Sequence, residues 1–580
     1  MVASHSSTII CLLALIGGAA VSAESTAPSA TSSACSAADG SCSKNNLDYL
    51  DPAVAQLIED LPTENSLYLD GNWIKPSSSS SSDNNNNDDK GDDAIDVVDP
   101  STGQTIARVS VANNWDVDMA VTSARRALEG WSVDTTLKKR RLLVSKFVGL
   151  FYKLSADEMA QLIAHELGAP IDFALDAQVS SGTYVMEQFL YETGGQGSFE
   201  SFYQLDEEED TMILNQAIGV VGLITPWNWP MNQIALKVIP ALLVGCTVIL
   251  KPSEETPLSA LLFGQLMHEA GFPPGVFQIV NGYGPSHVGE WLASHPNIDM
   301  VSFTGSTRGG KQVSLAAAPT LKRVSLEMGG KGANIIFDDL VEDEYMDDFK
   351  YAVEMGVWEV MSNSGQTCNA PTRMLVPEKY WNFALDVAKE TALSIVVGSA
   401  HVEGEHIGPV VSRSQYDRIQ SYIQSGIDQG ATLLVGGLGK PKAESGQNSD
   451  IKTQQLQEHY QDGYYVQPTI FADCNQDMDV WKEEIFGPVL CMTKFTTEEE
   501  AIRLANDSPY GLTHYAHTYD KERQMRLAQK LQSGMIVMNQ VGLASSAPFG
   551  GVKQSGTSRE GGVWGLEDFC IVKAISGLGY

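Results

Sequence analysis

The feature that most constrains the fold is a regular alternation of apolar, β-branched runs with longer helical stretches between residues 217 and 326. The apolar runs cover residues 217–224, 247–250, 276–280, 300–304 and 323–326, and the helical stretches cover 231–244, 258–270, 286–294 and 307–318. Strands and helices that alternate at this spacing form a parallel, doubly wound sheet with helices on both faces. We therefore predict an α/β fold that binds its ligands at the carboxyl ends of the strands.

Length and composition limit the number of domains and the classes of partner. The 580 residues, 43% of them apolar, can supply the cores of roughly two or three domains. There are 38 Lys and Arg against 72 Asp and Glu, which gives a formal net charge of −34. Nucleic acids and anionic membrane surfaces would repel such a chain, so neither is expected as a partner.

The N-terminus has the pattern of a secretory signal peptide over residues 1–23. Its apolar stretch, residues 8–21, is too short to cross a bilayer, and Val21-Ser22-Ala23 offers small residues for cleavage. No Lys or Arg precedes Lys44, which argues against a mitochondrial presequence. We expect the chain to enter the secretory pathway, to reside in the ER lumen, outside the cell or in an organelle reached from there, and to have no stable membrane insertion once mature.

Two polar tracts and a spacer interrupt the folded regions. Residues 24–62 are expected to be a polar spacer that ends in a short helix at 51–59. The tract 76–93 lacks apolar residues to bury, which predicts a disordered surface loop between two strands. The segment 441–461 is interpreted as a second polar insertion.

The cysteines and histidines do not predict a metal site. The chain has 8 cysteines, and the five after residue 200 form no C-x-x-C pair. The pairs His514/His517 and His401/His406 have no cysteine or histidine cluster beside them in the sequence, so we assign no metal.

Three residues carry the candidate chemistry. Cys368 lies in Ser-Gly-Gln-Thr-Cys-Asn, Glu327 in Leu-Glu-Met-Gly-Gly-Lys, and Asn228 in Thr-Pro-Trp-Asn-Trp-Pro. A thiol, a carboxylate and an amide can serve as nucleophile, base and oxyanion donor in an attack on a carbonyl carbon. Each residue alone has a plainer interpretation, because a single Cys is usually a buried apolar residue.

Together these motifs resemble the aldehyde dehydrogenase superfamily, from about residue 67 to the C-terminus. The segments TPWNWPMNQIALKVIPAL, SGQTCNAPTRMLVP and REGGVWGLEDF are most similar to a subgroup described as succinoylsemialdehyde-pyridine dehydrogenase-like, which does not establish a substrate. The resemblance implies a Rossmann-type NAD-binding domain, an α/β catalytic domain, and a small β-arm that would make a homodimer or homotetramer. The expected bounds are 63–330 for the NAD-binding domain, 331–553 for the catalytic domain and 554–580 for the return to the cofactor domain, with 199–217 and 570–580 in the arm.

A glycine turn after a predicted strand marks the expected cofactor site. Gly282-Tyr283-Gly284 fails the dinucleotide fingerprint because His287 holds the third glycine position. Gly305, Ser306 and Gly310 instead lie where a strand gives way to a helix, whose free N–H groups favour a phosphate. The resemblance assigns this turn to the cofactor's pyrophosphate and nicotinamide end.

Other cofactor contacts follow from the resemblance alone. Lys251 and Glu254 would bind the adenosine ribose, and Glu484 and Phe486 the nicotinamide ribose and ring. The remaining members of the predicted cofactor set are Thr225, Trp227 and Ser253. A carboxylate at Glu254 would repel a 2′-phosphate, so NAD is expected over NADP.

The implied reaction is aldehyde oxidation through covalent intermediates. Cys368 adds to the aldehyde, Asn228 and the Cys368 N–H hold the oxyanion, NAD accepts a hydride, and Glu327 activates the water that hydrolyses the thioester. Glu560 would relay a proton from Glu327, and Lys237 would either stabilise charge or take part in that relay. Two alternatives remain: a CoA-acylating relative, and a catalytically idle binding or structural protein on the same fold. Glu327 and Cys368 are 41 positions apart, about seven more than is usual in the family, and we expect the extra residues in the acidic stretch 338–348.

Overall fold

The computed structural model describes residue 47 and residues 49–77, 94–195, 197–206, 211–341, 346–442 and 451–577. The predicted signal peptide, the spacer up to residue 46, and residues 78–93 of the low-complexity tract lie outside the described residues. So do residues 342–345 of the acidic stretch and 443–450 of the second polar segment.

The first half of the molecule is built on a seven-stranded sheet. Across the sheet the strands are β11 (Arg323–Met328), β10 (Met300–Gly305), β7 (Val220–Ile224), β8 (Thr247–Lys251), β9 (Phe277–Ile279), β1 (Leu67–Leu69) and β2 (Asn72–Ile74). The five strands from β11 to β9 are parallel, and β1 and β2 extend the edge as an antiparallel hairpin. The predicted doubly wound α/β fold is confirmed.

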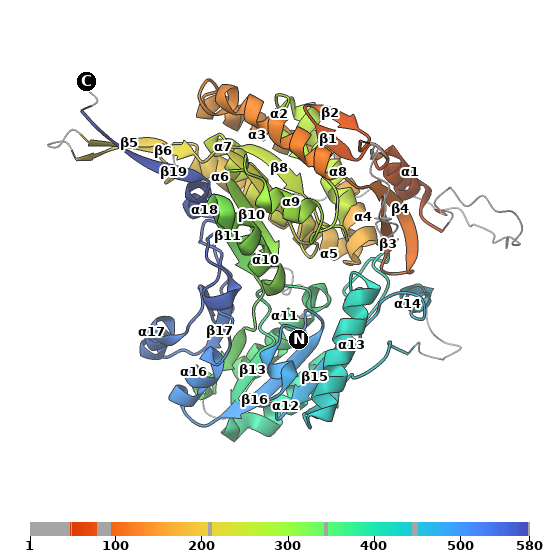
Figure 1. Ribbon diagram of the computed structural model, residues 1–580. Helices are drawn as coiled ribbons and strands as arrows, with labels where there is room; N and C mark the ends of the chain where they lie inside the picture. The colour runs from red at the N-terminus through yellow and green to blue at the C-terminus, as the bar shows by residue number, and fades with distance from the viewer. Residues whose placement is uncertain are drawn as a thin grey trace, which may run out of the picture.

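Helices cover both faces of this sheet (Figure 1). They are α2 (Asn114–Ser132), α3 (Leu137–Leu154), α4 (Ala156–Leu167), α5 (Ile171–Phe173), a π-helical segment (Ala174–Val179), α6 (Ser180–Glu192), α7 (Pro230–Val244), α8 (Pro257–Ala270), α9 (Val288–Ser294) and α10 (Thr307–Ala317). Both α7 and α8 have proline at the first helical position and end at a left-handed glycine, Gly245 or Gly271.

The sequence run 217–224 contains the last residue of one strand and the whole of the next. β6 (Thr211–Ala217) ends where the run begins, and β7 starts at Val220. Between them Gly219 has φ 135°, and a Cβ atom there would lie 1.9 Å from a carboxylate oxygen of Asp299. That carboxylate accepts a hydrogen bond from the Val220 N–H at 2.8 Å, so the turn requires glycine.

The second half is a separate seven-stranded sheet. Its strands, in order, are β14 (Thr432–Val435), β15 (Thr469–Ala472), β16 (Val489–Phe495), β13 (Arg373–Pro377), β12 (Ala333–Ile336), β17 (Thr513–His517) and β18 (Met535–Met538). Only the β14–β15 pair is antiparallel. Its helices are α11 (Asp347–Met361), α12 (Trp381–Ser394), α13 (Arg413–Asp428), α14 (Ile451–Gln457), α15 (Asp479–Lys482), α16 (Glu498–Asn506) and α17 (Lys521–Lys530).

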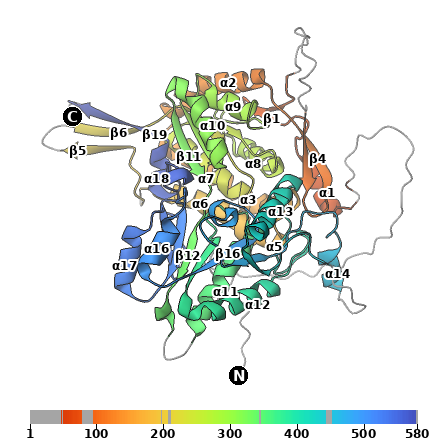
Figure 2. The same ribbon diagram turned by 60° about the horizontal axis from the view of Figure 1, so that its bottom comes forward.

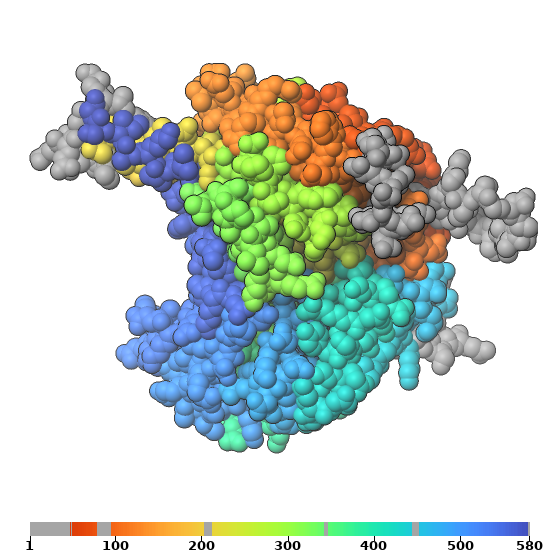
Figure 3. All heavy atoms as spheres, in the orientation of Figure 1, coloured from red at the N-terminus to blue at the C-terminus, as the bar shows by residue number. Residues whose placement is uncertain are grey.

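A three-stranded antiparallel arm projects from the body of the molecule, as both ribbon views and the space-filling view show (Figures 1, 2 and 3). It pairs β19 (Cys570–Ser576) with β6, and β6 with β5 (Phe202–Asp206). Segments about 360 residues apart in sequence therefore share one sheet, and the helix α18 (Gly562–Asp568) leads into its last strand. A two-stranded ribbon, β3 (Ala94–Asp99) and β4 (Gln104–Ser110), lies on the opposite side.

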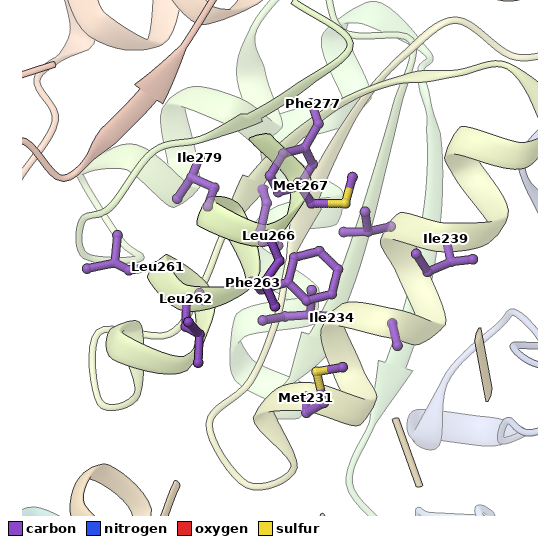
Figure 4. Packing of buried hydrophobic residues seen from close by; sticks show 14 of the residues in the cluster. Met231, Ile234, Ile239, Leu261, Leu262, Phe263, Leu266, Met267, Phe277 and Ile279 are labelled. Carbon is purple, nitrogen blue, oxygen red and sulfur yellow. The ribbon is translucent and has the colours of Figure 1, made fainter. Parts of the chain in front are cut away.

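Packing of apolar side chains fixes the first half. Ile234 of α7, Phe263 and Met267 of α8, and Phe277 of β9 pack in one cluster (Figure 4), and the rings of Phe263 and Phe277 lie 6.0 Å apart. The helix α1 (Pro52–Asp60) forms as predicted, and Val54 and Ile58 join the same cluster, so the folded region begins before residue 63. None of the helices in the described part of the chain combines the length and apolar character that crossing a bilayer requires.

Candidate active site

Cys368 lies on the segment between α11 and β13, which bends sharply before it. Asn363 and Ser364 have φ of 52° and 55°, a conformation that costs free energy outside glycine, and Gly365 follows with φ 74°. Gln366 holds the bend in place: its amide nitrogen donates to the Asn363 carbonyl at 3.1 Å, and its amide oxygen accepts from the Val411 N–H at 2.9 Å. The strain is concentrated immediately before the predicted nucleophile.

Asn228 lies against the same bend. It follows β7 and is 3% exposed. Its side-chain Nδ2 donates to the backbone carbonyl of Gln366 at 3.0 Å. Its backbone carbonyl accepts from the side-chain amides of Gln178 and Asn363, both at 3.0 Å. One of the two Nδ2 hydrogens is used by Gln366, which leaves the second for an oxyanion.

The Cys368 thiol is electrostatically held in its neutral form. Burial of the thiol, followed by the nearby negative charges of Glu484 and Glu327, raises its pKa to about 12. Both carboxylates therefore lie close enough to act on the sulfur. A nucleophilic thiolate at neutral pH requires a compensating positive charge or removal of these negative charges.

Glu327 lies near the end of β11, and its carboxyl group is buried. The residue is 3% exposed, and neither carboxylate oxygen has a hydrogen-bond partner among the described residues. Burial, followed by the charge of Glu560, raises the pKa of Glu327 well above its ordinary value, while Lys237 lowers it. A buried carboxyl with a raised pKa and no hydrogen-bond partner among the described residues is suited to general base catalysis.

Lys237 and Glu560 form a buried ion pair beside Glu327. Lys237 lies on α7 and Glu560 precedes α18, and their side chains are 1% and 7% exposed. The Lys237 ammonium also donates to the Ser302 hydroxyl on β10 at 2.9 Å. The structure thus brings all five predicted catalytic residues into one region, between the carboxyl ends of the first sheet and the second half.

The predicted adenosine-ribose contacts lie at the end of β8. Lys251 donates to Glu254 at 3.1 Å and to the Pro252 carbonyl at 2.9 Å. Burial raises the pKa of Glu254, but the positive charge of Lys251 lowers it. The pKa of Glu254 therefore stays below its usual value. Ser253 is buried and accepts from the Glu255 N–H, and the Thr225 N–H donates to the Lys251 carbonyl, which joins the ends of β7 and β8.

The glycine turn after β10 forms the start of α10. Ser306 caps this helix by accepting a hydrogen bond from the Gly309 N–H at 3.1 Å. A Cβ atom at Gly305 would lie 2.7 Å from the Phe303 ring, and one at Gly310 would lie 2.3 Å from the Met328 sulfur. Glycine at positions 305 and 310 therefore avoids clashes with Phe303 and Met328, and the N–H groups at the start of α10 that Ser306 does not cap are the ones that could meet a phosphate.

Glu484 and Phe486 reach the site from the second half. Glu484 accepts from the Gly330 N–H at 3.1 Å, and burial raises its pKa to about 7. Phe486 has φ 61° and packs edge-on against Trp227 with ring centroids 5.2 Å apart. These contacts connect the segment after β11 to the predicted nicotinamide contacts.

The sequence did not predict the residues that hold Asn228 and the bend before Cys368 in position. Gln178 comes from the π-helical segment, and neither it nor Asn363 and Gln366 was predicted to act there. Gln366 and Asn363 lie in or next to the Cys368 motif, so their amides were a usable signal. Nothing local distinguished Gln178, because its contacts are made across the fold.

The aldehyde dehydrogenase family model matches residues 87–575. The chain belongs to the aldehyde dehydrogenase family. This aldehyde dehydrogenase is 43% identical to 3-succinoylsemialdehyde-pyridine dehydrogenase from a Pseudomonas species, over 88% of this chain and 98% of that protein. The predicted family and its subgroup resemblance are confirmed.

Solved structures agree with the fold of this aldehyde dehydrogenase. An aldehyde dehydrogenase from Bartonella henselae has a TM-score of 0.79 and 46% identity, with 88% of this chain and 98% of that one covered. An aldehyde dehydrogenase C mutant from Pseudomonas syringae, complexed with NAD+ and octanal, has a TM-score of 0.79 and 39% identity, with 91% and 98% covered. Betaine aldehyde dehydrogenase from Staphylococcus aureus, complexed with NAD+, has a TM-score of 0.79 and 32% identity, with 90% and 96% covered.

Proposed function

We propose that this aldehyde dehydrogenase oxidises an aldehyde to its carboxylic acid with NAD+, through a thiohemiacetal and a thioester on Cys368. The observation that carries the proposal is the meeting of the Cys368 bend, the Asn228 amide and the unpartnered carboxyl of Glu327. Relatives of at least 32% identity solved with NAD+ support the choice of cofactor.

The first step is addition of the Cys368 thiolate to the aldehyde carbon. The negative charge that develops on the oxygen is stabilised by the second Nδ2 hydrogen of Asn228 and by the Cys368 N–H. The Asn228 donor is fixed before substrate arrives, because the Gln366 carbonyl and the amides of Gln178 and Asn363 hold Asn228 in position. When bound, NAD+ supplies the hydride acceptor for the oxidation and a positive charge near the thiol.

The last step is hydrolysis of the thioester. Glu327 takes a proton from water as the water attacks the acyl carbon. Its raised pKa makes the ionised form a stronger base than an ordinary carboxylate. The pair of Lys237 and Glu560, with its short buried contact, gives the proton a route toward α18. Retention of this base favours water over CoA as the acyl acceptor.

The substrate is a small or medium aldehyde. The relative named 3-succinoylsemialdehyde-pyridine dehydrogenase makes a pyridine-substituted semialdehyde the first to test, followed by octanal and betaine aldehyde. We propose further that the β5–β6–β19 arm joins copies of the chain as a homodimer or homotetramer, and that residues 1–23 direct it to the secretory pathway.

The decisive experiment is NADH formation by purified protein, residues 24–580, over this aldehyde panel. We expect turnover that is lost in C368S and kept in C246S, since Cys246 lies outside the catalytic set but, like Cys368, has a thiol whose pKa is raised to about 12. No turnover with any aldehyde by folded, fully reduced protein would favour the idle binding protein. Turnover that requires CoA would favour the acylating alternative.

A further inference from the structure

Two cysteines outside the active site lie on neighbouring strands of the second sheet. Cys491 is in β16, and Cys474 comes two residues after the end of β15. These strands run parallel and pair Phe471 with Cys491 (Figure 1). Cys474 is 2% exposed and Cys491 is 0% exposed, and both are free thiols that the proposed reaction does not use.

The backbone holds Cys474 beside β16. Asp473 has φ 52°, so the chain turns directly after β15, and the Cys474 N–H then donates to the Met492 carbonyl at 3.2 Å. The Cys474 sulfur lies 3.6 Å from the carbonyl oxygen of Phe471, the residue that is paired with Cys491. The turn therefore keeps Cys474 next to the strand that carries Cys491.

The two cysteine side chains point to the same face of the sheet. Cys474, Cys491 and Phe471 belong to one apolar cluster, whereas Leu490 and Met492 belong to the cluster on the other face. This alternation is that of a regular strand. A side-chain hydrogen bond also joins the two thiols, with the Cys474 S–H as donor to the Cys491 sulfur. The sulfur atoms are thus neighbours, as a bond between them requires.

The surroundings of Cys491 favour its thiolate. The hydrogen bond from Cys474 lowers the pKa of the Cys491 thiol, and the positive charges of Lys331 and Arg373 lower it as well, against the effect of burial. The Lys331 Nζ is buried and has no hydrogen-bond partner among the described residues. A thiolate is the form of cysteine that attacks a disulfide, so Cys491 is suited to thiol–disulfide exchange.

We propose that Cys474 and Cys491 form a disulfide bond when the chain folds in an oxidising compartment, as the proposed secretory route would provide. The oxidant is a disulfide, either glutathione disulfide or that of an oxidoreductase. One protein thiolate attacks it, forms a mixed disulfide and releases one thiolate, and the second protein thiolate then displaces the other. Two protein thiols are thereby oxidised, the oxidant is reduced to two thiols, and the two protons pass to the released sulfurs.

The bond would close the segment that carries two predicted cofactor contacts. Glu484 and Phe486 lie between the two cysteines, in a loop of about 18 residues. Closing a loop of this length restricts the unfolded chain and so stabilises the folded one. Since both sulfurs are buried in the folded chain, the exchange takes place before the sheet closes. The reaction at Cys368 does not require the bond.

The test compares one sequence made in two compartments. Residues 24–580 are produced in the bacterial periplasm, which is oxidising, and in the bacterial cytoplasm, which is reducing. Free thiols are blocked with N-ethylmaleimide in denaturant, and trypsin then places Cys474 in the peptide 453–482 and Cys491 in the peptide 483–494. Mass spectrometry should find these two peptides joined in the periplasmic protein and separate in the cytoplasmic protein.

The thermal midpoint gives a second readout. The periplasmic protein should unfold about 3–6 °C above the cytoplasmic protein, and the double variant C474A/C491A should remove this difference. C246A/C570A is the matched control, because Cys246 and Cys570 are also buried free thiols, and each donates to a backbone carbonyl. This control should keep both the joined peptides and the difference in midpoint.

Separate peptides in the periplasmic protein would overturn the proposal. A link between Cys246 and Cys570 in equal yield would also overturn it, because oxidation would then be unselective. If the periplasmic protein does not fold, the cytoplasmic protein is treated with glutathione disulfide in urea below its unfolding midpoint, where the sheet opens transiently. Joined peptides 453–482 and 483–494 would then support the bond, and free thiols at both positions would exclude it.

Discussion

The ammonium of Lys237 and the carboxylate of Glu560 form an ion pair in the interior, although 323 residues separate them in sequence. The second oxygen of Glu560 has no hydrogen-bond partner among the described residues, so Lys237 is its principal compensation. The negative charge of Glu560 raises the pKa of Glu327, and the positive charge of Lys237 lowers it. The pair therefore sets the pH range in which Glu327 can act as a base.

Substitutions of the two partners should shift the pH profile in opposite directions. Glu327 must be ionised to act, so activity falls as pH drops through its raised pKa. E560Q removes a negative charge and should move this acidic limb to lower pH, and K237M removes a positive charge and should move it higher, each by about one unit. The measurement is kcat against pH.

The control for this pair is S302A, which deletes the hydrogen bond from Lys237 but keeps both charges, and should leave the limb in place. Breaking a buried pair also destabilises the fold by about 3–5 kcal/mol, so each profile is taken below the thermal midpoint of its variant. If the acidic limb moved in the same direction in E560Q and in K237M, the result would contradict the electrostatic account.

E327Q should separate acylation from hydrolysis. The amide has the shape of the protonated carboxyl but cannot take a proton from water, so the thioester should accumulate. We expect a rapid burst of about one NADH per active subunit, followed by a steady rate lowered about 10²–10⁴-fold. Stopped-flow absorbance at the NADH band measures both phases. An unchanged steady rate would mean that another group activates the water.

N228A should weaken oxyanion stabilisation. Loss of one oxyanion donor costs about 10²–10³-fold in kcat. Since Asn228 also holds the Gln366 carbonyl, the rate of Cys368 alkylation by iodoacetamide is measured in parallel to show whether the bend is intact. A fall in kcat with normal alkylation supports the oxyanion role, and equal losses in both would assign Asn228 a purely structural role.

E254S should relax the choice between cofactors. Lys251 keeps Glu254 ionised, and an ionised carboxylate repels a 2′-phosphate on the ribose. We expect the ratio of kcat/KM for NADP to that for NAD to rise by roughly tenfold or more, which is about 1.4 kcal/mol. E255S, at the neighbouring half-buried carboxylate, is the control. No change in the ratio would remove Glu254 from cofactor selection.

Much of the site could be read from the sequence because its residues follow the ends of strands. Asn228 follows β7, Lys251 ends β8, Gly305 ends β10 and Glu327 lies near the end of β11. In a parallel sheet these ends share one edge, so a correct strand pattern places the residues together without knowledge of any contact. The contacts that orient them could not be predicted in this way.

The sequence by itself determined the α/β class, the order of strands and helices between residues 217 and 326, the family, and the identity of the candidate nucleophile, base and oxyanion donor. Its periodicity records which face of each element is buried, which is a local property. Only the tertiary structure decided that Gln178 supports Asn228 and that Lys237 meets Glu560. These are single side-chain contacts between distant segments, and the physical reason they escape prediction is that no repeat or spacing in the chain encodes them.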